Sequence, residues 1–463
     1  KIRRNKFHFT SLGCARNLVD SEVMIGLLIR AGYEIVVQEK HADYLVINTC
    51  GFLESAREEA MVVLEEIFTY KKPSAKVIVV GCMVQKYGAL LKKRFPAIHY
   101  LLGSGDVEKI LDAVKQDEGE HISSARSYLA AGEIPRLRTT PEHYAYLKIA
   151  EGCKKRCAFC IIPTIKGPLQ SKPTHWIIKE FQSLLKSGVF EVVLIAQDLG
   201  DYGKDRGEKR ALANLLRKML EQPQDFWLRL LYLYPDEIDQ ELIDIIASDP
   251  RICNYVDMPI QHISDQVLKR MHRKTSAKDI LQTIENLHKK IPNISIRTSL
   301  MVGYPGETEQ QFAELAAFLE KGMIDHVGVF TYSREKESYS DRLQDHLPEK
   351  VKKQRYNTLM TIQQQNVQQK NRRLIGKKIP ILVEGYHPDS TYLLAARHQG
   401  QAPEVDGLVI LNDFQTVNRL PAMYNAKIQD TTSYDLIAKT LSPIKSSYAK
   451  TKVQESLPVV NSF

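Results

Sequence analysis

Residues 149–163 read IAEGCKKRCAFCIIP and contain Cys153, Cys157 and Cys160 in the spacing C-x3-C-x2-C. This spacing lets three thiolates from one short loop bind a single inorganic centre. An iron–sulfur cube normally takes four cysteine ligands, so three would leave one iron open for a substrate or cofactor. Zinc is the alternative, but zinc sites usually combine two ligand pairs, and no second pair follows here. The spacing therefore favours an iron–sulfur cluster over zinc.

The same spacing, with the aromatic Phe159 just before Cys160, resembles that of the radical S-adenosylmethionine enzymes. The resemblance implies that the open iron binds S-adenosylmethionine and donates one electron to split it. It also makes Phe159 a candidate contact of this cofactor.

A repeated strand and helix pattern surrounds the loop. Six apolar runs alternate with amphipathic stretches from residue 144 onward, and this alternation predicts βα units with a parallel sheet. The runs are 145–150, 192–197, 228–232, 255–260, 294–302 and 327–331, and the expected helices are 176–186, 212–220, 237–247, 278–289 and 309–321. Six units make a partial (β/α)6 barrel with an open side. The cysteine loop follows the first strand, at the barrel end where chemistry gathers.

Three polar residues at or near later strand ends are further candidate contacts of the cofactor. Gln197 ends the run LIAQ, Gln261 ends MPIQ, and Arg297 lies in SIRTSLMV. By resemblance to radical enzymes of this type, Gln197 would receive the methionine amino group. Cys253 stands outside the cysteine motifs, and we expect it to be a structural thiol because free cysteine behaves as a small apolar residue.

The N-terminal stretch repeats one arrangement three times. Apolar runs at 7–12, 44–47 and 77–80 are followed by Cys14, Cys50 and Cys82, and each cysteine precedes a helical pattern. In a parallel sheet the carboxyl ends of the strands open on one edge, so the three thiols should meet there. Three unrelated buried cysteines are the alternative. The identical placement favours a second cluster with three cysteine ligands.

The C-terminal part has a different pattern. Residues 348–373 form a basic, glutamine-rich helical connector, and residues 377–439 contain short β-prone runs between turns. This predicts a small antiparallel barrel. Seven acidic and three basic residues between positions 379 and 438 would repel phosphate, which argues for a basic protein partner rather than nucleic acid. Simple solvation of a small barrel is the alternative reading of this charge.

Together these features resemble the methylthiotransferases, and most closely those of the RimO type. The motifs that carry the resemblance are SLGCARNLVDSE, NTCGF, YLKIAEGCKKRCAFCIIP, LIAQD, LRLLYLYP, MPIQHISDQVLKRMHR, MVGYPGET and VGVFTYSRE. The family implies two 4Fe–4S clusters, one on Cys14, Cys50 and Cys82 and one on the C-x3-C-x2-C cysteines, and S-adenosylmethionine as both radical source and methyl donor. It also implies methylthiolation of an aspartate β-carbon on the small-subunit ribosomal protein numbered twelve. A tRNA adenosine methylthiotransferase of the same architecture is the alternative.

The expected fold is α/β with five segments. They are a parallel-sheet methylthiotransferase domain at 6–117, a linker at 118–141, a radical S-adenosylmethionine core at 142–373, a TRAM barrel at 374–440 and a disordered tail at 441–463. The 463-residue chain carries a net charge of +9 and seven cysteines, and it has no apolar run of eighteen residues that would span a membrane. We therefore expect a cytoplasmic monomer that needs an electron donor such as flavodoxin or ferredoxin and no membrane.

Overall fold

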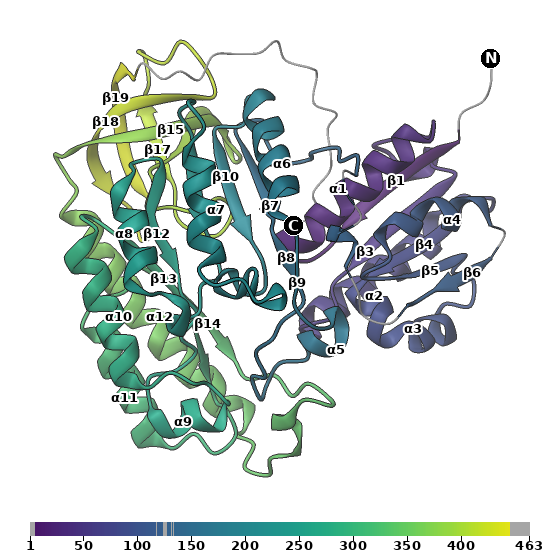
Figure 1. The fold of residues 1–463 in the computed structure, drawn as a ribbon, viewed down its shortest axis with the longest axis horizontal. Helices are drawn as coiled ribbons and strands as arrows, with labels where there is room; N and C mark the ends of the chain where they lie inside the picture. Colours follow the sequence, from purple (N-terminus) through teal and green to yellow (C-terminus); the bar gives the residue numbers. More distant parts are fainter. Residues whose placement is uncertain (1–4, 117, 124–126, 131, 133, 445–463) are drawn as a thin grey trace.

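The computed structural model describes residues 5–116, 118–123, 127–130, 132 and 134–444. It contains an N-terminal α/β domain, a central α/β half-barrel and a C-terminal β-barrel, joined in that order along the chain (Figure 1). No helix among these residues has the length and apolar character needed to cross a bilayer.

The N-terminal domain is a six-stranded sheet in the order β2-β1-β3-β4-β5-β6, with every neighbouring pair parallel. Its central strand β3 reads YLVINT and is buried throughout, as expected for a parallel sheet covered on both faces. The strands are β1 Lys6–Ser11, β2 Glu34–Ile35, β3 Tyr44–Thr49, β4 Lys76–Gly81, β5 Tyr100–Gly103 and β6 Gly119–His121, and the helices are α1 Ala15–Arg30, α2 Glu54–Tyr70, α3 Cys82–Arg94 and α4 Ile110–Lys115. Strand β6 lies within the predicted linker; three residues are too few to show a period in the sequence.

The central domain is a second six-stranded parallel sheet, in the order β14-β13-β12-β11-β10-β7. The sheet is open rather than closed, as the six apolar runs predicted. Its strands are β7 Tyr144–Lys148, β10 Glu191–Ile195, β11 Trp227–Leu230, β12 Ile252–Asp257, β13 Ser295–Val302 and β14 His326–Thr331. The helices are α6 Thr174–Lys186, α7 Ala211–Leu220, α8 Gln240–Ser248, α9 Asp265–Arg270, α10 Ala277–Lys290, α11 Glu309–Glu320 and α12 Glu349–Arg372.

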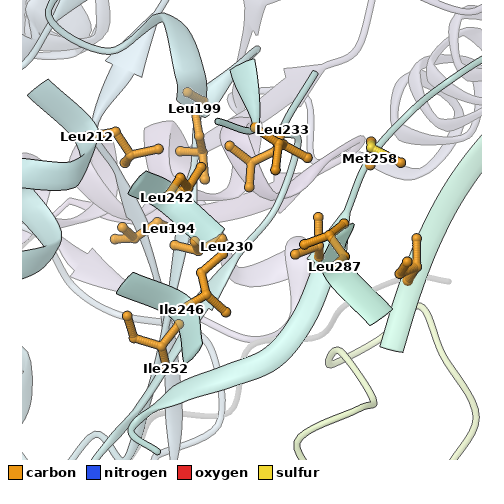
Figure 2. Packing of buried hydrophobic residues seen from close by; sticks show 14 of the residues in the cluster. Leu194, Leu199, Leu212, Leu230, Leu233, Leu242, Ile246, Ile252, Met258 and Leu287 are labelled. Carbon is orange, nitrogen blue, oxygen red and sulfur yellow. The ribbon is translucent and has the colours of Figure 1, made fainter. Parts of the chain in front are cut away.

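The two faces of the central sheet are covered by different parts of the chain, because side chains alternate along each strand. Leu194 and Leu230 lie on the helix side, in a core with Leu212 of α7 and Leu242 of α8 (Figure 2). The intervening residue Val193 lies in a separate apolar cluster on the other face. Most of the buried apolar residues of this domain therefore sit between the sheet and its outer helices.

That other, concave face packs against both terminal domains. Tyr146 of β7 and Tyr255 of β12 share one apolar cluster with Val19 of α1 and with Leu382 and Met423 of the C-terminal barrel. Figure 1 shows α1 beside β7 and the C-terminal strands at one end of the central sheet. The cluster joins the three domains through one shared core.

The C-terminal barrel closes in the order β15-β16-β17-β19-β18. Four of its neighbouring pairs are antiparallel, as predicted, and β17 pairs with β19 in parallel. The strands are β15 Lys378–His387, β16 Ser390–Arg397, β17 Val409–Asp413, β18 Ala422–Thr431 and β19 Leu436–Pro443. Strand β19 runs past the predicted module end at residue 440, and residues 445–463 of the predicted disordered tail lie outside the described residues.

Candidate active site

The three N-terminal cysteines lie on neighbouring segments at one edge of the first sheet. Cys14 is the N-cap of α1, Cys50 follows β3, and Cys82 begins α3 directly after β4. A Cβ atom added to Gly13 would lie 2.9 Å from the Cys50 Cβ, and one added to Gly51 would lie 2.7 Å from the Cys82 carbonyl oxygen. Missing side chains at these two glycines thus let the three thiol-bearing segments touch, as the repeated strand, cysteine and helix pattern predicted.

The other three cysteines lie on one loop between the short strand β8 (Ala150–Glu151) and helix α5 (Ile162–Lys166). The Cys160 amide donates to the Cys157 carbonyl at 3.1 Å, which folds the C-x2-C segment into a turn. The Ile162 amide donates to the Cys160 Sγ at 3.4 Å, and the Arg273 Nη1 lies 3.8 Å from the Cys157 Sγ. These contacts place N–H donors beside two of the three sulfurs.

The two groups of cysteines face one region of the molecule. Cys82 packs in a small apolar cluster with Ile161, which directly follows Cys160, with Ile165 of α5, and with the partly buried Phe52. The Ile165 carbonyl also accepts a hydrogen bond from the Ser104 hydroxyl of the N-terminal domain at 3.3 Å. Helix α5 therefore joins the loop of the second group to the sheet edge of the first.

All six thiols are free, and burial raises the pKa of four of them, Cys50, Cys82, Cys153 and Cys160. Burial raises the pKa of Cys82 and of Cys160 to about 12, and that of Cys153 to about 11. At Cys14, burial is outweighed by the Arg16 charge and by backbone donors, which lower the pKa. Cluster ligands are thiolates, so metal binding would have to displace protons from most of these sulfurs. Free, converging thiols with glycine beside them fit two iron–sulfur clusters of three ligands each.

Arg16 lies between the two groups of cysteines. Its Nη1 donates to the Ala196 carbonyl at 2.8 Å, at the carboxyl end of β10. Its guanidinium carbon lies 4.7 Å from the centre of the Tyr232 ring, just after β11. Burial acts on both nearby thiols; the Arg16 charge outweighs it at Cys14, whose pKa is lowered, and only partly opposes it at Cys160, whose pKa stays raised. Sequence reasoning missed this residue, and its place two positions after Cys14 was the only signal.

Lys155 fixes the cysteine loop to the loops that follow β10 and β11. Its ammonium lies 3.0 Å from Asp236 and 2.5 Å from Glu237, and 3.5 Å from Asp198. Burial and the nearby Asp201 raise the pKa of Asp198 to about 7, although Lys155 opposes them. The ammonium of Lys155 neutralises part of the charge of these carboxylates, and the ion pairs hold the cysteine loop in place.

The four other predicted cofactor contacts lie in different environments. Phe159 packs against Val267, Met271, Tyr304 and Tyr332. Gln197 follows β10, and its Oε1 is buried with no hydrogen-bond partner among the described residues. Gln261 follows β12 with φ 71°.

Arg297 lies on β13 and its charge is already matched. Its Nη1 lies 3.2 Å from Asp257, and its Nε lies 3.5 Å from Asp406 of the C-terminal barrel. Among the four contacts, Gln197 is the one with a buried side-chain oxygen that has no hydrogen-bond partner among the described residues.

Four buried charges connect the N-terminal and central domains. Lys166 lies 3.2 Å from Asp20 of α1 and 2.8 Å from Glu151, and Lys148 pairs with the same two carboxylates. Burial lowers the pKa of Lys166, but the carboxylates raise it further, so the net pKa lies well above its ordinary value. Two cations and two anions balance within the domain interface.

We expect Lys166→Met to destabilise this interface by about 3–5 kcal/mol, because it leaves Asp20 and Glu151 sharing one buried cation. Thermal unfolding followed by fluorescence measures the loss. Lys115→Met, at an exposed lysine at the end of α4, is the matched control and should leave the unfolding temperature unchanged. Equal unfolding temperatures for the two variants would contradict this role.

Comparison with known families covers most of the chain in three segments. Residues 6–103 match the uncharacterized protein family UPF0004, residues 147–319 match the radical SAM superfamily, and residues 375–441 match the TRAM domain. The three matches fall in the N-terminal domain, the central domain and the C-terminal barrel, in that order.

Full-length relatives decide the family. The chain is 56% identical to the ribosomal protein uS12 methylthiotransferase RimO of Protochlamydia amoebophila, over 94% of this chain and 93% of the relative. The chain belongs to the RimO family. It is also 51% identical to RimO of Chlamydia abortus, over 95% and 96% of the two chains, and 42% identical to RimO of Syntrophotalea carbinolica, over 95% and 97%. RimO proteins are radical S-adenosylmethionine enzymes, so a 4Fe–4S cluster and S-adenosylmethionine belong to this chain's chemistry.

Solved structures agree with the fold. The radical S-adenosylmethionine methyltransferase TsrM from Kitasatospora setae superimposes with a TM-score of 0.52 at 14% identity, over 71% of this chain and 75% of that chain. At this identity the likeness concerns the fold alone.

Proposed function

We propose that this RimO-family protein methylthiolates the β-carbon of an aspartate in ribosomal protein uS12, with two 4Fe–4S clusters. Cys153, Cys157 and Cys160 would hold one cluster, and Cys14, Cys50 and Cys82 the other. When bound, the first cluster and S-adenosylmethionine supply a radical that removes hydrogen, and the second cluster supplies sulfur. No side-chain base could remove this unreactive hydrogen at neutral pH, so the cofactors carry that chemistry.

The contact of Cys82 with Ile161 and Ile165 is the observation that carries this proposal. It brings the second group of thiols next to the loop of the first, so two clusters would share one region. A single-cluster enzyme would not need three further free thiols at that place. The full-length identity to RimO proteins supports the same reading.

The chain's own side chains would position and shield the reacting groups. Lys155 holds the cysteine loop against the loops after β10 and β11, and the unused Oε1 of Gln197 suits the amino group of S-adenosylmethionine. Lys166 and Lys148 fix the two domains, and therefore the two groups of thiols, relative to each other.

Several acidic residues of the C-terminal barrel face the central domain and not the solvent. Glu384, Glu404 and Asp406 of the C-terminal barrel contact His143, Tyr144 and Tyr255 of the central domain, so these acids do not face a partner. Asp389, Asp413 and Asp430 are exposed, and so is Lys427. The acidic charge on the surface is smaller than the sequence count suggested, and the choice of a protein substrate now depends on the RimO relatives.

Turnover of reconstituted protein tests the proposal. The protein would be incubated without oxygen with S-adenosylmethionine, dithionite and either uS12 or tRNA, and the products analysed by mass spectrometry. We expect a methylthio group on the uS12 aspartate and none on tRNA. A methylthio group on tRNA alone would contradict the proposal and favour the adenosine-modifying alternative.

Four further properties stay predictions from the sequence. They are an electron donor such as flavodoxin or ferredoxin, a monomeric state, a cytoplasmic location and the domain limits. The three matched segments and the bounds of the strands support a division of the chain into three structural units joined by connecting stretches.

A further inference from the structure

Arg16 is a residue of the N-terminal domain whose side chain reaches the mouth of the central half-barrel. It hydrogen-bonds to the Ala196 carbonyl after β10 and lies over the Tyr232 ring after β11. Both contacts are at carboxyl ends of parallel strands, where substrates of such barrels bind. Its own backbone is two residues from Cys14, so its guanidinium lies between the two groups of thiols.

Arg16 differs from three other cations around the site in its partners. Lys166, Lys155 and Arg297 each pair with at least two carboxylates. Within the part of the chain that the structure describes, Arg16 forms no ion pair with a carboxylate, and one main-chain carbonyl is its hydrogen-bond acceptor. A guanidinium has five N–H donors and stays charged at any ordinary pH, so most of its donors are available to a ligand.

We propose that Arg16 binds the side-chain carboxylate of the target aspartate and so selects aspartate as the residue to be modified. This inference rests on the proposed function. A guanidinium fork matches a carboxylate with two parallel hydrogen bonds, which fix direction as well as distance. The carboxylate carbon is bonded directly to the β-carbon. A carboxylate held by Arg16 therefore places the reacting carbon between the two groups of thiols.

A second role for the same charge would be to balance the negative charge of a bound cluster. The two roles differ in one respect. Charge balance acts whatever the substrate, whereas carboxylate binding acts on aspartate and vanishes for asparagine, which has the same shape and no charge. Two peptides that carry either aspartate or asparagine at the target position therefore separate the two roles.

The test measures peptide binding to the reconstituted holoenzyme with S-adenosylmethionine and without reductant, so that no turnover occurs. Fluorescence anisotropy would follow labelled uS12 peptides with aspartate or asparagine at the target position. We expect the wild-type protein to bind the aspartate peptide about 10- to 100-fold more tightly, as for a charge-assisted hydrogen-bonded pair. Arg16→Gln should remove this preference, with little change for the asparagine peptide. Arg16→Lys should keep part of it, because it retains the charge without the fork.

Arg217→Gln, at an exposed arginine on the outer helix α7, is the matched control and should keep the full preference. Iron content and the visible spectrum of each variant report whether the clusters are intact. The wild-type protein with its two peptides tests the inference even without a folded variant, because equal affinities would overturn it. A preference that survives in Arg16→Gln would also overturn it, as would an equal loss for both peptides.

Turnover with the aspartate peptide separates this inference from the proposed function. If the wild-type protein modifies no uS12 peptide, the proposed function fails and the inference with it. If the wild-type protein modifies the peptide, but Arg16→Gln discriminates between aspartate and asparagine as the wild type does, the inference alone fails.

Discussion

Replacing Cys14, Cys50 and Cys82 together by alanine is expected to abolish methylthio transfer while S-adenosylmethionine is still cleaved. The triple variant removes the ligands of one proposed cluster and leaves the C-x3-C-x2-C loop intact. Iron content should fall from about eight to about four atoms per chain, since each 4Fe–4S cluster holds four. Production of 5′-deoxyadenosine, measured by liquid chromatography, should persist. The methylthio product should be absent from the mass spectrum.

The complementary triple variant at Cys153, Cys157 and Cys160 provides the comparison. It should also keep about four irons, but it should produce no 5′-deoxyadenosine. Cys253→Ala is the matched control, because this buried thiol lies in the apolar cluster of the concave face. It should keep both clusters and both products. Loss of all iron in either triple variant would contradict two independent sites.

Replacing Arg397 by methionine is expected to destabilise the contact of the C-terminal barrel with the central domain by about 3–5 kcal/mol, the usual effect of removing one partner from a buried ion pair. The Arg397 Nη2 lies 2.6 Å from Glu191 of β10, and its Nε donates to Glu384 at 2.7 Å. Glu191 also pairs with Arg229, and all three of these central side chains are 0–1% exposed. Without Arg397, the carboxylates of Glu191 and Glu384 lose a cationic partner in the buried interface. Thermal unfolding and hydrogen exchange in β15 and β16 measure the effect.

Arg372→Met, at an exposed arginine at the end of α12, is the control and should behave as the wild type. The acid side of the stability curve offers a second check. Burial raises the pKa of Glu384, but Arg397 and His143 lower it to about 2, below its ordinary value. The stabilisation by this carboxylate is therefore complete above about pH 4.3 and is lost as the pH falls toward about 2. In Arg397→Met this acid-dependent loss should shrink; an unchanged acid profile would contradict the pairing.

Much of the fold was predictable because its signals are periodic and local. The six central strands and their helices follow from apolar runs that alternate with amphipathic stretches, and the observed strands lie within a few residues of the expected ones. The short edge strand β6 and the parallel pair β17–β19 were not predicted. Strand β6 is too short to show a period, and strand direction in a small barrel depends on contacts between distant residues.

The site was predictable where one residue type recurs in a fixed spacing, as the cysteines do. The roles of the charged residues around the cysteines were not predictable. Arg16, Lys166 and Asp20 contact partners more than a hundred residues away in the sequence. The cofactor contact predicted for Arg297 stays a prediction. The structure adds that its guanidinium pairs with Asp257 and with Asp406 of the C-terminal barrel, partners that no local pattern indicates.

The shared core on the concave face has a consequence for synthesis of the chain. The concave face carries Tyr146, Tyr255 and the buried Glu191–Arg229 pair, all on strands of the central sheet. Residues that cover this face, including Arg397 and Ala402, are translated more than a hundred residues later. Until then the half-barrel presents an uncovered apolar surface on the ribosome, the kind of surface that draws chaperones or other nascent chains. The concave face of the half-barrel is therefore fully covered only after the C-terminal barrel has been translated.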